Sequence, residues 1–169
     1  MVAAAAIQLR REGVALPGAL GMLSPAADAS NKGDTVVTLN AVDPILPGID
    51  PAIGDAPDVT VALYIGNNTS ELRNPLVSPV ITDFASIFTG GTLPPTLIQV
   101  GLREILLSDA VRLYHKMKEA APAPGHVVLS PYEGMWHVWQ GYVDVPEAVA
   151  AQKELGDFLT RALNGQVCK

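Results

Sequence analysis

The chain has 169 residues, of which 49% are hydrophobic and 17% are charged, and its net charge is −6 at pH 7. This composition excludes an intrinsically disordered chain. The 11 Lys and Arg residues do not cluster, so we expect no nucleic-acid partner. No apolar run reaches the roughly 18 residues that a transmembrane helix needs, so we also expect no membrane span.

The two ends of the chain bear on its cellular compartment. At the N-terminus an apolar run comes first and Arg10 and Arg11 follow it, whereas a secretory signal has its charges first. Cys168 is the single cysteine, which excludes an intrachain disulfide and a thiolate metal site. We therefore expect a cytoplasmic protein and interpret Cys168 as a tail residue without a role.

The first half of the chain predicts one helix, one strand and long connections. Residues 2–13 are rich in alanine and end at a glycine, which predicts a helix. Residues 18–23 form a short apolar run before Ser-Pro and predict a buried strand. Residues 26–57 predict a long surface excursion with a short helix around 36–42. Residues 59–65 fit either a helix or a strand, and 67–93 predict loops.

The second half alternates more regularly. Residues 96–100 are apolar and β-branched after two prolines, and they predict a strand. An amphipathic helix follows from residue 107 or 108 to 121, then a buried strand at 127–129 and a last helix at 145–163. Strands that alternate with helices predict an α/β fold, with three parallel strands and flanking helices.

Chemically active side chains follow two of these strands. Glu104 and Asp109 come after the strand at 96–100, and His137 comes after the strand at 127–129. Sites in open α/β sheets form beyond the carboxyl ends of the strands. A carboxylate there can accept a hydrogen bond from one imidazole nitrogen while the other nitrogen faces a nucleophile. An acid followed by a histidine is also the second half of the Ser, acid, His order in α/β-hydrolases.

Five segments in order resemble the hormone-sensitive-lipase-like esterase family of α/β-hydrolases. In chain order the segments are Leu23–Pro25, Ala41–Pro44, Asn74–Pro79, Pro94–Gly101 followed by Glu104–Asp109, and Gly134–Trp139. The last two of them carry the acid and the histidine.

The resemblance implies a partial domain over residues 1–169, the C-terminal half of the family's fold. Glu104 would be the catalytic acid and His137 the base. The helix at 2–13 would be the one that follows the nucleophile turn, but no Gly-X-Ser-X-Gly motif occurs in the sequence. The N-terminal strands, the oxyanion segment and the nucleophilic serine would then lie outside the chain.

Other assignments remain open beside this interpretation. Asp109 is the alternative acid, although a carboxylate at that position also suits the first turn of a helix. The remaining histidines and neighbouring side chains are interpreted as structural, with His115 on the surface, His126 without a partner, Glu133 in solvent, and Trp136 and Trp139 in the core or a pocket wall. No His-Glu-X-X-His motif occurs, so we expect no metal and no cofactor.

Two functions compete at this stage. The first is a fragment of a carboxylic ester hydrolase of Ser-His-Glu type, which acts on small ester substrates when complete and is inactive alone. The second is a non-catalytic, hydrolase-derived binding module. In both cases we expect residues 18–23 to form an unpaired apolar edge that drives self-association or complementation by a missing half. The helix at 2–13 would also lose part of the surface against which Ala3, Ile7 and Leu9 pack.

Overall fold

The computed structural model describes residues 1–46 and 59–167. Its elements in chain order are α1 (Val2–Arg11), β1 (Leu20–Leu23), α2 (Asp34–Thr38), α3 (Val59–Tyr64), η2 (Thr69–Arg73), η3 (Pro79–Ile81), α4 (Phe84–Ile87), η4 (Thr89–Gly91), β2 (Thr96–Gly101), α5 (Leu107–Lys118), β3 (Val127–Tyr132), η5 (Trp139–Gly141) and α6 (Pro146–Leu163). Part of the predicted surface excursion and Cys168 lie outside the described residues.

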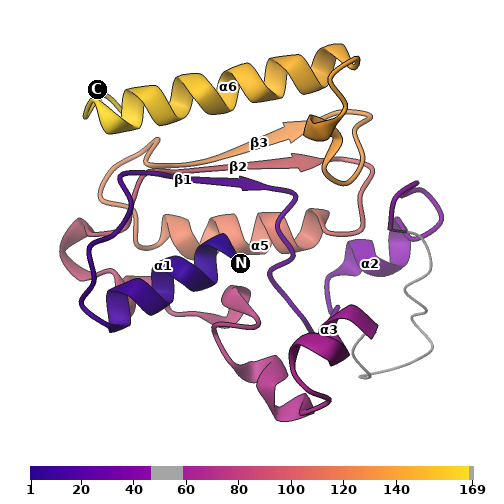
Figure 1. Cartoon of the computed structure of the whole chain (residues 1–169), viewed down its shortest axis with the longest axis horizontal. Coiled ribbons are helices and arrows are strands. Elements are labelled where there is room, and N and C mark those ends of the chain that lie inside the picture. Colours follow the sequence, from indigo (N-terminus) through magenta and orange to yellow (C-terminus); the bar gives the residue numbers. More distant parts are fainter. Residues whose placement is uncertain (47–58, 168–169) are drawn as a thin grey trace.

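The three strands form one parallel sheet in the order β1-β2-β3. Leu20 pairs with Thr96, and Thr96 pairs with Val127. All three arrows point the same way in Figure 1, so the loops that follow the strands leave from one end of the sheet. The predicted three-stranded parallel sheet with flanking helices is confirmed, and β1 lies at an edge of the described sheet.

Helices cover both faces of this sheet. The long helix α6 lies over one face, and α1 and α5 lie under the other (Figure 1). The α6 helix packs closely on β1 because Gly21 has no side chain: a Cβ there would lie 2.6 Å from the Leu155 side chain. On the opposite face Ile7, Ile98 and Leu113 meet in the main apolar core.

The N-terminal helix differs from the expectation that its apolar face loses cover. Ala3, Ala6 and Ile7 are all buried, because α1 packs against β1 and α4, and Leu9 is partly buried. The helix also ends at Arg11 rather than at residue 13, since Gly13 turns into the left-handed region with φ of 67°. The exposed positions at this end are Met1 and Val2.

The short helix expected around residues 36–42 begins and ends earlier, at Asp34–Thr38. Its first turn is tied to the start of α5, because the Thr35 amide and the Ser108 amide each donate to the other residue's hydroxyl. The segment 67–93, expected as loops, contains η2, η3, α4 and η4.

His126 has a partner, contrary to the sequence interpretation. Its Nε2 lies 2.6 Å from the carbonyl oxygen of Leu93, in a buried contact between the segments that precede β3 and β2. The two residues are 33 positions apart in sequence, so the local pattern around His126 could not reveal the contact.

Candidate active site

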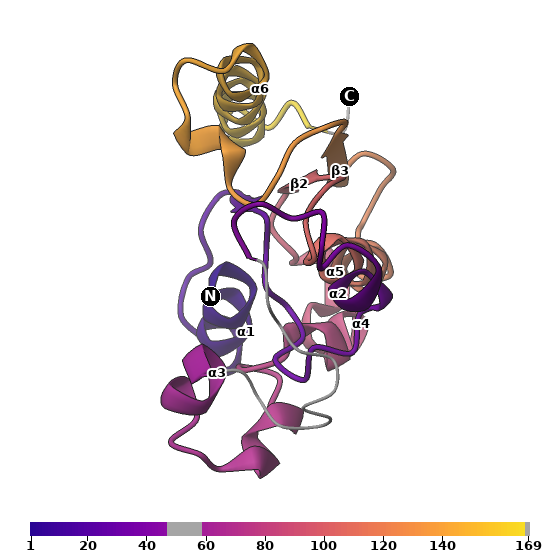
Figure 2. The ribbon, with the colours of Figure 1, turned by 90° about the vertical axis from the view of Figure 1, so that its right-hand side faces the viewer.

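The candidate site lies where the three strands end. Figure 2 looks onto this end of the sheet, with α6 above and α1 and α5 below. Ser24 directly follows β1, Glu104 follows β2, and His137 follows β3. Because parallel strands deliver their following loops to the same edge, three residues far apart in sequence meet here.

Glu104 lies in the turn between β2 and α5, and none of its surface is exposed. Its Oε2 accepts a hydrogen bond from the Ser24 hydroxyl at 2.7 Å and one from the Gly101 amide at 3.2 Å. Its Oε1 has no hydrogen-bond partner among the described residues. One carboxylate oxygen is therefore fixed in place and the other is left for a second group.

That second group is His137. Its Nδ1 lies 4.0 Å from Glu104 Oε1, and Nδ1 also has no hydrogen-bond partner within residues 1–46 and 59–167. The side chain is 20% exposed, so the imidazole is sheltered on the side of the acid and reachable from solvent. Catalytic hydrogen bonds are often long before substrate binds and tighten in the complex, and this pair has that geometry.

The loop that carries His137 passes very close to the end of β2. The Arg103 amide donates to the Met135 carbonyl at 2.9 Å. A Cβ at Gly101 would lie only 2.3 Å from that same carbonyl oxygen. Only glycine fits at this position, so Gly101 allows the histidine loop to approach the acid turn.

Burial shifts both groups away from their charged forms. It raises the pKa of Glu104 from 4.5 to about 7, against the lowering effect of the Ser24 and Gly101 hydrogen bonds. Burial also lowers the pKa of His137, and the nearby Asp43 carboxylate opposes that change. An imidazole held neutral at pH 7 can accept a proton, and an adjacent carboxylate that ionises would stabilise the resulting imidazolium.

Asp43 holds the acid turn from the other side. Its Oδ2 accepts from the amide of Ile105, next to Glu104, at 3.0 Å, and its Oδ1 accepts from the amides of Ile45 and Leu46. Asp43 is only 3% exposed. The carboxylate therefore fixes the position of the backbone immediately after Glu104.

Asp109, the alternative acid, faces another part of the molecule. It lies in the first turn of α5, and its Oδ2 accepts from the amides of Ala27 and Asp28, both at 2.8 Å. Burial raises the pKa of Asp109 to about 6. This carboxylate anchors the loop after β1 to α5, whereas Glu104 is the acid that lies beside His137.

The other singled-out side chains are surface or core residues. His115 and Glu133 are exposed, as predicted. Trp139 is fully buried and packs with Tyr132 and the half-buried Trp136 under α6, which confirms the core interpretation. The described residues contain no group of histidine, cysteine or carboxylate side chains arranged to hold a metal ion. Within those residues, no helix is long and apolar enough to span a membrane.

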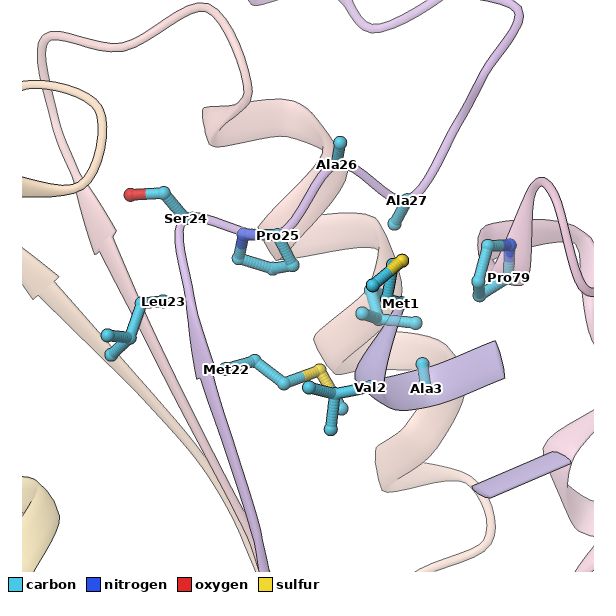
Figure 3. A pocket seen from close by; sticks show the side chains of 11 residues that line it. Met1, Val2, Ala3, Met22, Leu23, Ser24, Pro25, Ala26, Ala27 and Pro79 are labelled. Carbon is cyan, nitrogen blue, oxygen red and sulfur yellow. The ribbon is translucent and has the colours of Figure 1, made fainter. Parts of the chain in front are cut away.

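A cavity of about 200 Å³ opens beside the end of β1. Its wall combines the first residues of α1 with the segment that follows β1, and Figure 3 shows Met1 and Val2 facing Met22 and Pro25 across it. Ser24 stands at its border. The N-terminal end of α1 and the end of β1, which Ser24 follows, thus line one space.

Sequence reasoning missed the roles of Ser24 and Asp43. Both occur in segments that resemble the esterase family, Leu23–Pro25 and Ala41–Pro44, but neither segment suggested a contact. The two contacts link residues 80 and 62 positions apart. Their only signal in the sequence was the presence of these two segments, in order, beside the segment that carries the acid.

The chain is similar to known hydrolases over most of its length. A sequence profile of the alpha/beta hydrolase fold matches residues 1–141. An acetyl-hydrolase from Streptomyces hygroscopicus is 35% identical over 166 residues, which cover 95% of this chain and 49% of that protein. An esterase from Acinetobacter venetianus is 30% identical, over 93% of this chain and 47% of that protein. The chain spans about half the length of these curated relatives.

Solved structures of esterases and lipases are also similar to the chain over about half of their length. An esterase of the bacterial hormone-sensitive lipase family superposes with a TM-score of 0.77 at 33% identity, covering 95% of this chain and 49% of that one. A hormone-sensitive lipase from a metagenome library gives a TM-score of 0.77 at 28% identity, covering 95% of this chain and 50% of that one.

Proposed function

The chain belongs to the alpha/beta hydrolase family, and on that premise we propose that it carries the acid and the base of a carboxylic ester hydrolase, Glu104 and His137. The observation that carries the proposal is their pairing at the ends of adjacent strands, where Oε1 and Nδ1 face each other at 4.0 Å and neither atom has a hydrogen-bond partner among the described residues. Asp109 does not fill this role, because it binds the amides of Ala27 and Asp28 instead.

Each residue has a definite task in this reaction. The Nε2 atom of His137 takes the proton of a serine hydroxyl during acylation and returns it to the leaving alcohol. Glu104 accepts from Nδ1, which keeps Nε2 free of a proton and orients the ring. When the ring becomes an imidazolium, the ionised form of Glu104 stabilises it.

The nucleophile comes from residues outside this sequence, because the sequence has no Gly-X-Ser-X-Gly motif. In α/β-hydrolases the nucleophilic serine lies on a sharp turn between a strand and a helix. The helix α1 begins at Val2, and its first residues line the cavity beside the end of β1. A turn placed before α1 would therefore bring its serine to the strand ends that hold His137.

The substrate class follows from the relatives. Those named above are an acetyl-hydrolase and esterases, so the complete protein would hydrolyse small carboxylic ester substrates. No metal or organic cofactor takes part in the proposed reaction, since the imidazole and the carboxylate perform the proton transfers.

The test begins with the DNA upstream of the Met1 codon. We expect an in-frame Gly-X-Ser-X-Gly codon series a short distance upstream, and we expect the extended protein to hydrolyse p-nitrophenyl butyrate. An unrelated upstream sequence, together with no activity when an esterase N-terminal half is co-expressed, would contradict the proposal. That result would favour a non-catalytic module derived from the hydrolase fold.

A further inference from the structure

Ser24 has an unusual backbone conformation at the border of the site. Its φ is 46°, in the left-handed region, although it is not a glycine and precedes Pro25. The residue is 3% exposed, and its amide donates to the Gln99 carbonyl at 2.8 Å, which continues the pairing of β1 with β2. Contacts with β2 therefore hold Ser24 in a conformation that the residue rarely adopts.

This conformation places the Ser24 hydroxyl between the acid and the histidine loop. The hydroxyl donates to Glu104 Oε2 at 2.7 Å and accepts from the Val138 amide at 3.1 Å. With the Gly101 amide, it occupies Oε2 and leaves Oε1 for His137. One oxygen atom thus contacts both segments that carry the proposed catalytic pair.

The bond to Val138 acts on the residue directly after His137. Val138 is also in the left-handed region, with φ of 54°, which is a rare conformation for a β-branched residue. The side chain of Val138 is partly exposed, so burial of that side chain does not explain the conformation. The bond from its amide to Ser24 Oγ is the contact that ties this strained turn to the acid.

We propose that Ser24 is a positioning residue. It holds the carboxylate of Glu104 and the loop of His137 in place relative to each other, so that Oε1 faces Nδ1. The inference rests on the proposed function and adds a role to a residue outside the acid and base. Ser24 acts through Glu104 and Val138 and does not itself touch the substrate.

Ser24 is not a substitute nucleophile. Its hydroxyl is buried and bound to the acid, whereas a nucleophile would be exposed and bound to the histidine. Figure 3 shows the hydroxyl of Ser24 turned away from the cavity that Met1 and Ala27 line. The geometry therefore assigns the residue to the support of the pair.

The test measures the imidazole of His137 in the 169-residue chain by ¹H–¹⁵N NMR, with His137→Gln identifying its signals. At about pH 8, where most of Glu104 is ionised, we expect the neutral ring to carry its proton mainly on Nδ1, facing Glu104. In Ser24→Ala and Ser24→Gly the lost bond lets the pKa of Glu104 rise further, so less ionised carboxylate faces the ring. The Nδ1-protonated fraction should fall below one half, and the pKa of His137 should drop by roughly one pH unit.

Two comparisons make the result decisive. Ser24→Gly relieves the left-handed backbone while removing the hydroxyl, so an equal effect in both variants assigns the cause to the hydroxyl. Ser78→Ala removes another fully buried serine hydroxyl, one that binds the Ala29 amide, and should leave His137 unchanged.

If the parent ring is protonated on Nδ1 and Ser24→Gly leaves both its tautomer and its pKa unchanged, the role of Ser24 is overturned while the proposed function stands. If the parent ring is already protonated on Nε2 at about pH 8, where most of Glu104 is ionised, the pairing with Glu104 fails, and the proposed function fails with it.

Discussion

His137 Nδ1 faces Glu104 Oε1 at 4.0 Å, and each atom lacks any other partner in the described part of the chain. The other oxygen of the acid and the neighbouring Asp43 are well supplied: Glu104 Oε2 has two donors and Asp43 has three. Further buried atoms of the described residues, such as Asp109 Oδ1 and Trp136 Nε1, also lack a partner. At Glu104 and His137 two such atoms face each other, and because a buried polar atom without a partner costs free energy, we expect a bond to form between them during function.

The 169-residue chain alone should not hydrolyse esters, because it contains no nucleophile motif. Loss of triad members lowers kcat by several orders of magnitude even when the rest of the site remains. The measurement is a p-nitrophenyl acetate and butyrate assay on the purified chain. Turnover on the order of 10 per second that disappears in His137→Ala would show that a complete site is already present.

Stability should depend on pH through Glu104. Burial raises its pKa from 4.5 to about 7, so the folded chain holds a proton that the unfolded chain releases. The stabilising contribution of Glu104 is fully present below about pH 4.5 and is lost as pH rises through about 7. The free energy of unfolding changes by an amount on the order of 3 kcal/mol over this range.

Urea unfolding of the parent and of Glu104→Gln at several pH values between about 4.5 and 8 isolates this contribution. Asp109 acts in the same direction, since its pKa is raised to about 6, and the lowered pKa of His137 acts in the opposite direction. Asp109 and His137 are present in both the parent and Glu104→Gln, so their contributions cancel in the difference between the two proteins. The difference in unfolding free energy, parent minus variant, should therefore decrease as pH rises, and a difference that stays flat would exclude a raised pKa.

Gly101→Ala should displace the histidine loop, because the new Cβ would lie 2.3 Å from the Met135 carbonyl oxygen. Overpacking of this kind costs about 1–3 kcal/mol, and a shift of about 1 Å in a catalytic group lowers kcat by roughly 100-fold. Thermal unfolding and the ester assay on the extended protein measure the two effects.

Gly156→Ala is the matched control for this substitution. Gly156 is an exposed position of α6, and a Cβ added there would meet no heavy atom within 4 Å, so alanine should stabilise the helix by about 0.5–1 kcal/mol. If both variants lost activity equally, the close approach of the histidine loop to Gly101 would not be the cause of the loss.

The free edge of β1 should cause self-association. β1 pairs with β2 alone among the described strands, and an unpaired strand edge is a template for another chain. Size-exclusion chromatography with light scattering should show a mass that rises with concentration. Leu23→Pro, which removes an edge amide, should reduce this rise, while Leu63→Ser at a distant exposed site should not. A monodisperse monomer at all concentrations would contradict the prediction.

The sequence predicts the sheet better than the site. Thr96–Val100 and Val127–Leu129 become strands because apolar runs of this length suit a strand of a parallel sheet that helices cover on both faces. Leu113 and Met117 become core because they share one face of a helix. The partners of Ser24, Asp43 and His126 depend on contacts between distant segments, and no local period encodes such contacts.

The identity of the acid is the central claim, and kcat of the extended protein for p-nitrophenyl butyrate tests it most directly. His137→Ala should abolish turnover, and Glu104→Gln should lower kcat by orders of magnitude with the fold intact, because an amide favours the wrong imidazole tautomer. Asp109→Asn should act mainly on stability, through its bonds to Ala27 and Asp28. If Asp109→Asn instead lowered kcat more than Glu104→Gln did, the assignment of Glu104 would be wrong.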